Sequence, residues 1–499
     1  NGVMASNQWV AIENEDAGED DEPEHYWYYF QANGKALTNG DNDKVSLKTI
    51  NGKKYAFDDE GKMLYGWVDE DSAERVDDTD SDGFKEGVYY FGGEDDGAMT
   101  TGWLQLDITY DEATNDDYKY TAAAFNDDED QTRWFYFKSN GKKIFAEDGD
   151  RTKDKTINGK KYAFDQYGAM VAEWSLDEDD LGTNPNAFTS NVASSAEVVT
   201  GKAFDSKYTE SWKYFNSVED GARVSKGWFK VVPAEKLNTG KYDDDEEAWY
   251  YADGSGKLSS GEFKTIKGKK YAFRTDGRMV SGLKFISDDG AGNFIVKADD
   301  NDEAAFGSFD TEDDFLANAP VYEAQGYKCY YFGDGDDGAM RTNKTSITID
   351  GDKFNFYFQK SGGHKGAGIT GEKDDKYYQS GMLMTAGSDE KYQIITPIMS
   401  GTQLVGYDKY ADVADLVDGN VFRQETSYTD ASLRTLGINK DADEVAELYV
   451  PVAASSAQNH ILINTSGKVI DNKGKSKDGN DYYYVVDASK KVVAIYLEN

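Results

Sequence analysis

Cysteine, histidine and long apolar runs are scarce in this 499-residue chain, and each shortage excludes something. Cys329 is the only cysteine, so no intrachain disulfide can form, and its place in a Tyr-Tyr-Phe strand predicts a core residue. No segment approaches the 18 apolar residues of a membrane span. The three histidines are dispersed, and no zinc spacing, phosphate loop or nucleophile motif accompanies them. We therefore expect no catalytic residues and do not expect an enzyme.

Basic residues are also in deficit. The chain has 54 Lys and Arg against 94 Asp and Glu, a formal charge of −40. Nucleic acid is excluded as an expected partner, because phosphate contacts need clustered Lys and Arg. Other polyanions would be repelled unless a cation bridged them. Neutral glycans and cationic head groups are compatible with this charge.

Glycine and aromatic residues, in contrast, are abundant and follow a repeat. Residues 50–63 recur almost verbatim at 157–170 and 266–279, and the copies lie 107 and 109 residues apart. Each copy reads as an aromatic strand, a tight glycine turn and a short strand, the pattern of a β-hairpin. An isolated hairpin is barely stable, whereas stacked hairpins bury their aromatic faces against one another. The sequence predicts an all-β fold, a β-solenoid of stacked hairpins with irregular insertions, with Tyr55, Tyr162 and Tyr271 in equivalent environments.

Two further hairpin types alternate with this one, giving a super-period of about 110 residues. The array is expected to span residues 1–385, with inserted strands or small lobes at 175–211 and 284–327. Residues 386–499 are expected to form a mostly β capping module. That module has a helix predicted near 430–436 and a late echo of the repeat at 461–468. The chain opens on text that matches a repeat interior, so we expect it to begin within a repeat.

All nine tryptophans fall into two recurring slots of the repeat. One slot follows glycine or its equivalent, and it holds Trp9, Trp67, Trp103, Trp174 and Trp228. The other opens an aromatic strand, and it holds Trp27, Trp134, Trp212 and Trp249. Tryptophan confined to two slots of a repeated unit indicates a repeated binding surface.

These motifs resemble the cell-wall-binding (choline-binding-type) repeats of Gram-positive surface proteins. They are also similar to the repeats of streptococcal glucan-binding enzymes and of clostridial toxin C-terminal arrays. The resemblance rests on residues 27–30 with Asn33-Gly34, on residues 97–103 and on residues 50–55, and it covers residues 1–385. It implies a β-solenoid, a secreted or cell-surface location, and binding of choline-bearing cell-wall polymer or polysaccharide between hairpins.

The resemblance also implies which residues would form the sites. Four complete tryptophan pairs are expected: Trp9 with Trp27, Trp103 with Trp134, Trp174 with Trp212, and Trp228 with Trp249. The neighbouring Tyr29 and Tyr136 are expected to take part in ligand binding as well. Val88 replaces the second tryptophan after Trp67, and lysine takes that slot in the copies at 50–63, 157–170 and 266–279. These departures leave both ligand classes open. Binding is expected within residues 1–260 and not within 261–499, and the alternative is that the rings are only core.

Two other interpretations stay open beside the binding and anchoring array. One is a structural adhesin or fibre stalk that self-associates through its repeats. The other is the anchoring part of a larger enzyme or toxin. No cofactor is expected to be required, although a calcium ion could bind. Asp78, Asp80 and Asp82 match the start of a calcium-binding loop, but the glutamate at the twelfth position of such a loop is missing. The alternative for these aspartates is a solvated acidic loop.

The acidic composition generates a prediction about calcium. A net charge of −40 destabilises the compact state by self-repulsion, which bound divalent cations would relieve. We expect millimolar calcium to raise the melting temperature more than the same concentration of magnesium. Scanning calorimetry in each salt measures the difference, and equal shifts would refute a calcium site.

Overall fold

The repeats fold as separate antiparallel hairpins in the computed structural model. Its described residues are 2–19, 22–76, 83–108, 131–147, 150, 152–176, 206–234, 237–288, 294–297, 309, 311–452, 459–471 and 476–499. The chain forms two compact units, Asn1–Ser260 and Gly261–Asn499.

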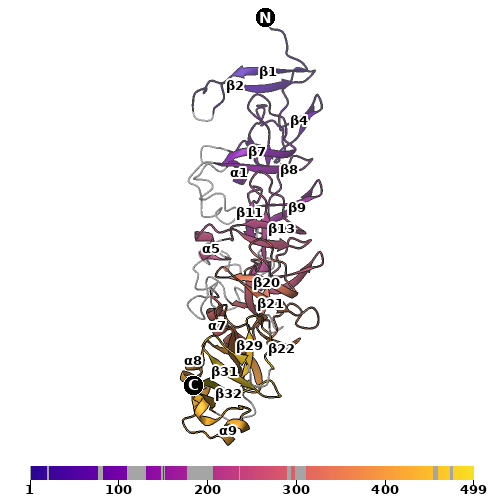
Figure 1. The fold of residues 1–499 in the computed structure, drawn as a ribbon. Coiled ribbons are helices and arrows are strands. Elements are labelled where there is room, and N and C mark those ends of the chain that lie inside the picture. Colours follow the sequence, from indigo (N-terminus) through magenta and orange to yellow (C-terminus); the bar gives the residue numbers. More distant parts are fainter. Residues whose placement is uncertain are drawn as a thin grey trace. The chain divides into compact units, whose positions relative to one another are not determined.

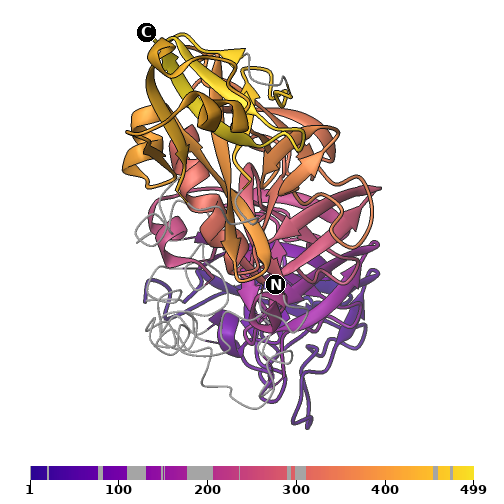
Figure 2. The ribbon, with the colours of Figure 1, turned by 60° about the horizontal axis from the view of Figure 1, so that its bottom comes forward.

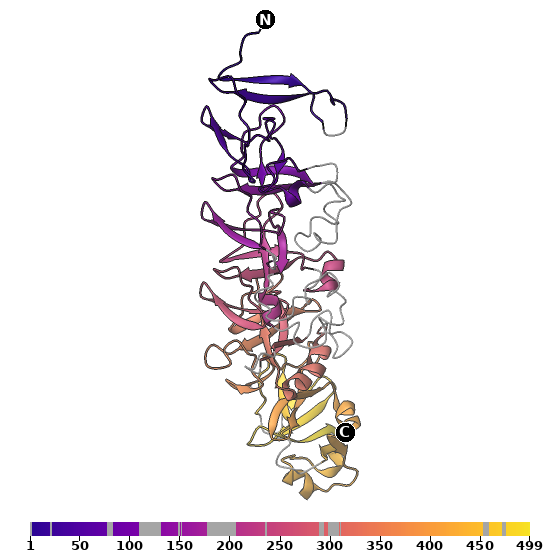
Figure 3. The same cartoon turned by 180° about the vertical axis from the view of Figure 1, so that it is seen from behind.

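The first unit contains seven two-stranded sheets among its described residues, each made by consecutive strands. Figures 1 and 3 show these hairpins following one another along the unit, from indigo to magenta. The strands are β1(Gln8–Glu13), β2(His25–Phe30), β3(Lys48–Ile50), β4(Lys53–Tyr55), β5(Trp67–Val68), β6(Tyr89–Tyr90), β7(Gly102–Ile108), β8(Gln131–Phe137), β9(Lys153–Ile157), β10(Lys160–Phe164), β11(Glu173–Leu176), β12(Trp212–Phe215), β13(Gly227–Val231) and β14(Ala248–Ala252). In the part of this unit that the structure describes, three short helices lie between the strands: α1(Gly83–Glu86), α4(Ser206–Glu210) and α5(Thr239–Asp243).

The near-identical copies keep an identical register. Tyr55, Tyr162 and Tyr271 lie opposite Lys48, Lys155 and Lys264 in the hairpins β3–β4, β9–β10 and β15(Glu262–Ile266)–β16(Lys269–Phe273). Their turns place Asn or Lys and then Gly at positive φ, the combination that a two-residue hairpin turn requires. Hairpins β3–β4 and β9–β10 project on the same side of the first unit (Figure 3). The predicted equivalence of the tyrosines therefore holds for their register.

Successive hairpins are joined by one recurring contact, which we call the methionine ladder. Met63, Met99 and Met170 each fill the space where a Cβ would stand on a glycine of the next turn. Those glycines, Gly97, Gly141 and Gly221, all have positive φ. The backbone N–H of each methionine donates, at 2.8 Å, to a carbonyl of the preceding hairpin, on Trp27, Lys54 and Trp134. Each rung thus combines a side-chain packing contact with a backbone hydrogen bond.

The ladder extends beyond these three rungs. Met4 occupies the same position over Gly34, and Met279 and Met340 do so in the second unit. Two rungs of the first unit are cationic instead: Lys143 over Gly168, and Arg223 over Gly256. Both charged side chains are buried.

The second unit merges its strands into larger sheets. Beyond β15–β16, the described sheets have the orders β18-β17-β19, β20-β21-β24-β23-β22, β26-β25-β29 and β27-β28-β32-β31-β30. Figure 2 shows the last of them in yellow. The strands are β17(Leu283–Asp288), β18(Phe294–Lys297), β19(Lys328–Tyr331), β20(Asn343–Ile349), β21(Asp352–Phe358), β22(Gly371–Lys373), β23(Lys376–Gln379), β24(Met382–Leu383), β25(Tyr392–Ser400), β26(Gln403–Tyr410), β27(Phe422–Gln424), β28(Val445–Pro451), β29(Ile461–Asn464), β30(Ser476–Lys477), β31(Tyr482–Val486) and β32(Val492–Glu498). The helices are α7(Glu312–Ala324), α8(Val413–Asp418) and α9(Asp430–Thr435).

The insertion at 284–327 contains helix α7, an element that the aromatic composition did not indicate. Thr311 caps its N-terminus by accepting a hydrogen bond from the backbone of Asp314. Its buried face, including Phe315 and Tyr322, packs in one cluster with Cys329, which is fully buried as expected of a core residue. The insertion therefore adds a helix that shares its core with strands β20, β21 and β24.

The C-terminal region matches the sequence prediction at two points. Helix α9 lies where a helix was expected, and residue pair Ile463 and Val469 forms the isolated bridge that follows the aromatic strand in earlier repeats. The chain as a whole is mostly β and built from many small hairpin sheets. The boundary at residue 385 stays a prediction.

The ladder predicts unequal costs for two alanine substitutions in one hairpin region. Gly159 and Gly168 have similar φ values, 81° and 89°. A Cβ on Gly159 would meet nothing within 4 Å, whereas on Gly168 it would lie 2.6 Å from Cδ of Lys143 and 2.9 Å from the carbonyl oxygen of Ile144. We expect Gly159→Ala to cost about 1–2 kcal/mol of unfolding free energy from its backbone conformation alone. Gly168→Ala should cost about 1–3 kcal/mol more, from overpacking.

Urea unfolding followed by tryptophan fluorescence measures this difference, since all nine tryptophans lie in the first unit. Gly159→Ala is the matched control for backbone strain. Equal midpoints for the two variants would show that the rung over Gly168 contributes no constraint.

Candidate functional site

The tryptophan of each Gly-Trp slot faces a tyrosine across its hairpin in a constant geometry. Trp103 pairs in register with Tyr136, and their ring centroids are 5.1 Å apart. The same edge-on contact, at 5.1–5.2 Å, recurs in the other four hairpins: Trp9–Tyr29, Trp67–Tyr90, Trp174–Tyr214 and Trp228–Tyr251. Side chains two residues apart on a strand share a face, so the second tryptophan of each pair lies on this same face.

The two tryptophans of a pair form a perpendicular corner. Trp103 and Trp134 have centroids 6.3 Å apart and planes at 88°. The corners Trp174–Trp212 and Trp228–Trp249 repeat this geometry at 6.3 Å and 85°, and at 6.4 Å and 83°. The first hairpin differs: Trp27 sets its ring edge against His25, with centroids 5.4 Å apart. Corners of aromatic faces suit both a quaternary ammonium and the apolar face of a sugar.

The next hairpin along the chain adds aromatic rings to these sites. Trp103 contacts Tyr162 at 4.9 Å and Phe164 at 5.8 Å. Trp9 makes the same contacts with Tyr55 and Phe57, also at 4.9 and 5.8 Å. The Gly-Trp ring therefore belongs to the core between hairpins as well as to the corner.

A carboxylate closes the first two sites, and the sequence reasoning missed it. The indole N–H of Trp27 donates to Asp95 at 2.9 Å, and that of Trp134 donates to Glu219 at 3.2 Å. Both acids stand two residues before a ladder glycine, so they occupy equivalent turn positions. His25 also contacts Asp95, at 3.1 Å. The hydrogen bond from Trp27 is the main cause that lowers the pKa of Asp95, so this group carries its negative charge at neutral pH.

Burial separates the predicted site residues into two groups. Trp174 and Trp212 are 9% and 8% exposed, and the indole of Trp174 donates to the Val232 carbonyl at 2.8 Å. The tryptophans of the other three predicted pairs are half-buried: Trp9, Trp27, Trp103, Trp134, Trp228 and Trp249. Tyr29 and Tyr136 are half-buried as well. The structure thus brings Tyr29 and Tyr136 to the sites where the sequence placed them.

The site after Trp67, which lacks its second tryptophan, is occupied by a lysine of the ladder. The ammonium of Lys143 lies 5.0 Å from the Trp67 ring centroid and donates to the backbone carbonyl of Phe84. Lys143 is 2% exposed, and this burial lowers its pKa to about 7. The chain therefore supplies its own cation to this tryptophan.

Other predicted features lie elsewhere. The candidate calcium ligands Asp78, Asp80 and Asp82 fall outside the described residues. Within the described ranges, no group of three or more His, Cys, Asp or Glu side chains could hold a metal ion. Of the helices that the structure describes, none has the length and apolar character to cross a membrane.

Known proteins share the repeat sequence. No family model matches the chain. It is 27% identical over 335 residues to the glucosyltransferase-S of Streptococcus mutans, and the match covers 65% of this chain and 18% of the relative. The chain thus corresponds to about a fifth of that protein. This similarity to a streptococcal protein confirms the resemblance drawn from the repeat motifs.

Three solved pneumococcal (Streptococcus pneumoniae) structures are similar to this chain. The autolysin LytC in complex with a synthetic peptidoglycan ligand is 16% identical, with a TM-score of 0.31, over 77% of this chain and 54% of that chain. Choline-binding protein F, in the presence of a peptidoglycan analogue, is 19% identical, with a TM-score of 0.26, over 69% and 94%. CbpJ is 17% identical, with a TM-score of 0.26, over 76% and 100%.

The buried lysine predicts a pH-dependent gain from Lys143→Met, which restores the residue found on neighbouring rungs. The unfolded chain holds the proton up to pH 10.5, whereas the folded chain releases it near pH 7. The loss of unfolding free energy caused by burying Lys143 is therefore complete below pH 7, and it decreases as the pH rises to 10.5. We expect the variant to gain a few kcal/mol of unfolding free energy at pH 6 and about 1 kcal/mol at pH 9.5. Urea unfolding of both proteins at the two pH values measures this, and a gain that is absent at pH 6 would contradict it.

Proposed function

We propose that this chain is a non-catalytic binding and anchoring module, a β-solenoid that holds neutral polysaccharide or choline-bearing cell-wall polymer at its tryptophan corners. One observation carries the proposal: the same perpendicular corner recurs with half-buried rings, at Trp103–Trp134 and Trp228–Trp249. A ring needed only for packing would be buried, as Trp174 and Trp212 are. Trp9 and Trp27 offer a third site of altered shape.

The charge near the corners favours ligands that are neutral or cationic. Glu219 lies within hydrogen-bond distance of both Trp134 and Gln105, at 3.2 Å from each. A carboxylate there attracts an ammonium group and accepts hydrogen bonds from sugar hydroxyls, and it repels anions. The proposed sites therefore belong to the first unit, and the location that suits such a module is secreted or at the cell surface.

The similarity to a glucosyltransferase supports a second candidate, in which the array is the binding part of a larger enzyme. The match spans 18% of that relative, so an activity elsewhere in such a protein would be separate from the corners. We also propose that the repeat array extends to residue 385 and that residues 386–499 cap it.

The corner geometry predicts coupled losses of binding. Trp103→Ala and Trp134→Ala should each weaken binding at one site by about 2- to 30-fold, the range of a single aromatic contact with a cation. The double variant should lose less affinity than the product of the two single fold-losses, because both rings contact one ligand. Isothermal titration with choline, and separately with a neutral glucan oligosaccharide, measures each step.

Glu219→Gln separates the two ligand classes in the same experiment. The amide still accepts the indole hydrogen bond but removes the charge, so choline binding should weaken several-fold while glucan binding stays within about twofold. Trp174→Phe, in the buried corner, is the matched control and should leave both affinities unchanged. Binding that survives Trp134→Ala and the double variant, with melting curves showing folded protein, would make the rings purely structural.

A further inference from the structure

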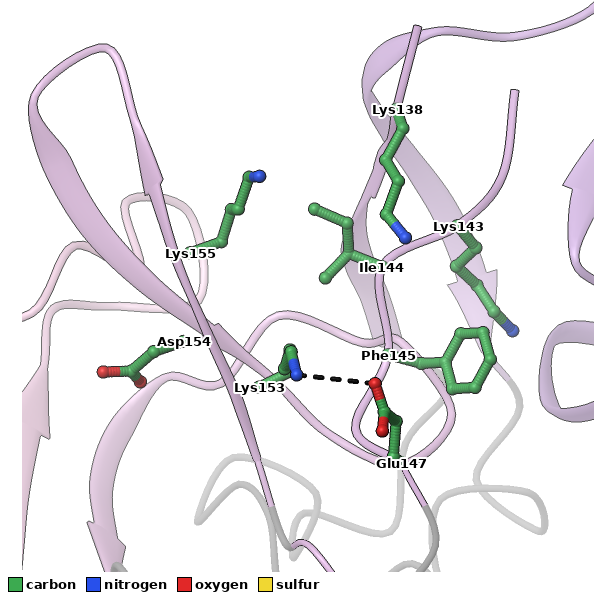
Figure 4. Close-up of a pocket in the computed structure, with 8 residues that line it drawn as sticks. All are labelled: Lys138, Lys143, Ile144, Phe145, Glu147, Lys153, Asp154 and Lys155. Carbon is green, nitrogen blue, oxygen red and sulfur yellow. Dashed lines mark ion pairs between the residues drawn. The ribbon is translucent and has the colours of Figure 1, made fainter. Parts of the chain in front are cut away.

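A cavity of the first unit departs from the acidic character of the chain. It measures about 330 Å³ and is lined by Lys138, which follows strand β8, and by Lys153 and Lys155 of strand β9. Ile144 and Phe145 add an apolar wall (Figure 4). Ligand pockets in proteins begin near about 300 Å³, so the cavity can hold a small molecule.

The two carboxylates of the lining are each neutralised by an ion pair. Glu147 pairs with Lys153 at 3.6 Å, the contact drawn in Figure 4. Asp154 pairs with the buried guanidinium of Arg223 at 3.0 Å. Neither pair leaves a net negative charge at the cavity.

Two ammonium groups are left over. Lys138 and Lys155 have exposed side chains, and the described residues show no ion pair to either. In Figure 4 they lie on opposite sides of Ile144, while Asp154 points away from both. The ammonium of Lys143 is committed to the carbonyl of Phe84. The cavity thus presents two cations that have no ion-pair partner among the described residues.

The sequence of the other repeats shows that two of these three lining lysines are specific to this copy. Lys138 occupies the same turn position as Gln31 and Asp253, because the backbone N–H of each donates to the carbonyl of the residue four positions later. Lys153 corresponds in the repeat to Ser46 and Glu262. A structural need for lysine would apply to every copy, so packing of the hairpins does not explain Lys138 or Lys153, whereas Lys155 recurs as Lys48 and Lys264.

We propose that this cavity binds a sugar carrying one carboxylate or phosphate group. The ammoniums of Lys138 and Lys155 hold the anion, and Phe145, which is 39% exposed, together with Ile144 packs against the ring. The net charge of −40 does not prevent this, because salt screens charges beyond about 8 Å at physiological ionic strength. The site is independent of the tryptophan corners and of the function proposed for them.

The test uses the full chain and three probes: glucuronate, glucose 6-phosphate and glucose. Saturation-transfer NMR and isothermal titration at 50 and 300 mM salt give the affinities. Lys138→Gln with Lys155→Gln removes both ammoniums, and the first change copies the residue of the first repeat. Lys54→Gln with Lys161→Gln is the matched control, because it removes two exposed lysines of the equivalent hairpins and changes the net charge equally.

We expect glucuronate, glucose 6-phosphate or both to bind, more tightly at low salt, and we expect any binding of glucose at the tryptophan corners to be unaffected by the cavity variant. The cavity variant should weaken this binding about tenfold or more, and the control variant should change it less than about twofold. The preferred probe identifies the anion as carboxylate or phosphate. Trp134→Ala should leave acidic-sugar binding intact, so failure of the corner sites is distinguishable. Absence of acidic-sugar binding, or equal losses in both double variants, would overturn the proposal.

Discussion

The fit of one side chain over one glycine sets the spacing of the hairpins in the first unit. Each rung of the methionine ladder needs a glycine at positive φ, because any Cβ there would occupy the volume of the methionine. The rung also fixes a backbone hydrogen bond to the preceding hairpin. Two-stranded hairpins are too small to be stable alone, so this contact turns independent pieces into one core.

The aromatic corners depend on the ladder. Trp103 can face Tyr162 and Phe164 of the next hairpin only if that hairpin is held at a fixed distance. The constancy of the ring distances between repeats, 4.9 and 5.8 Å in both copies, reflects this. The same ring surface is thereby shared between core and solvent. A chain poor in aliphatic residues can build both its interior and a binding face from the same few side chains.

Much of this arrangement could be predicted because its signals are local. Asn-Gly turns, alternating aromatic strands and the repeat spacing identify the hairpins of the first unit and the register of Tyr55 and Tyr162. Helix α7 also had a local signal, the Thr311 cap with Asp314, but the aromatic composition around it favoured strands. The merging of strands into five-stranded sheets in the second unit has no such signal, since it depends on pairings such as β28 with β32.

The parts of the site that sequence reasoning missed are contacts between distant residues. Asp95 lies 68 residues from Trp27, and Glu219 lies 85 from Trp134, so only their shared place before a ladder glycine could have indicated them. Lys143 could not be identified from the sequence for another reason. It replaces methionine on a rung, and a lysine in a turn is normally expected to be exposed to solvent. Burial lowers the pKa of this lysine, and the periodicity of the sequence does not show that the residue is buried.

The ladder also has a genetic consequence. Residues 50–63 and 157–170 are nearly identical, so recombination between their coding segments would remove or add 107 residues in frame. After such an exchange Met170 would meet the carbonyl of Trp27 in place of Trp134, a residue of the same type in the same hairpin position. Every remaining rung would keep its partner. An array shortened or lengthened by 107 residues would therefore keep the same type of contact at the junction.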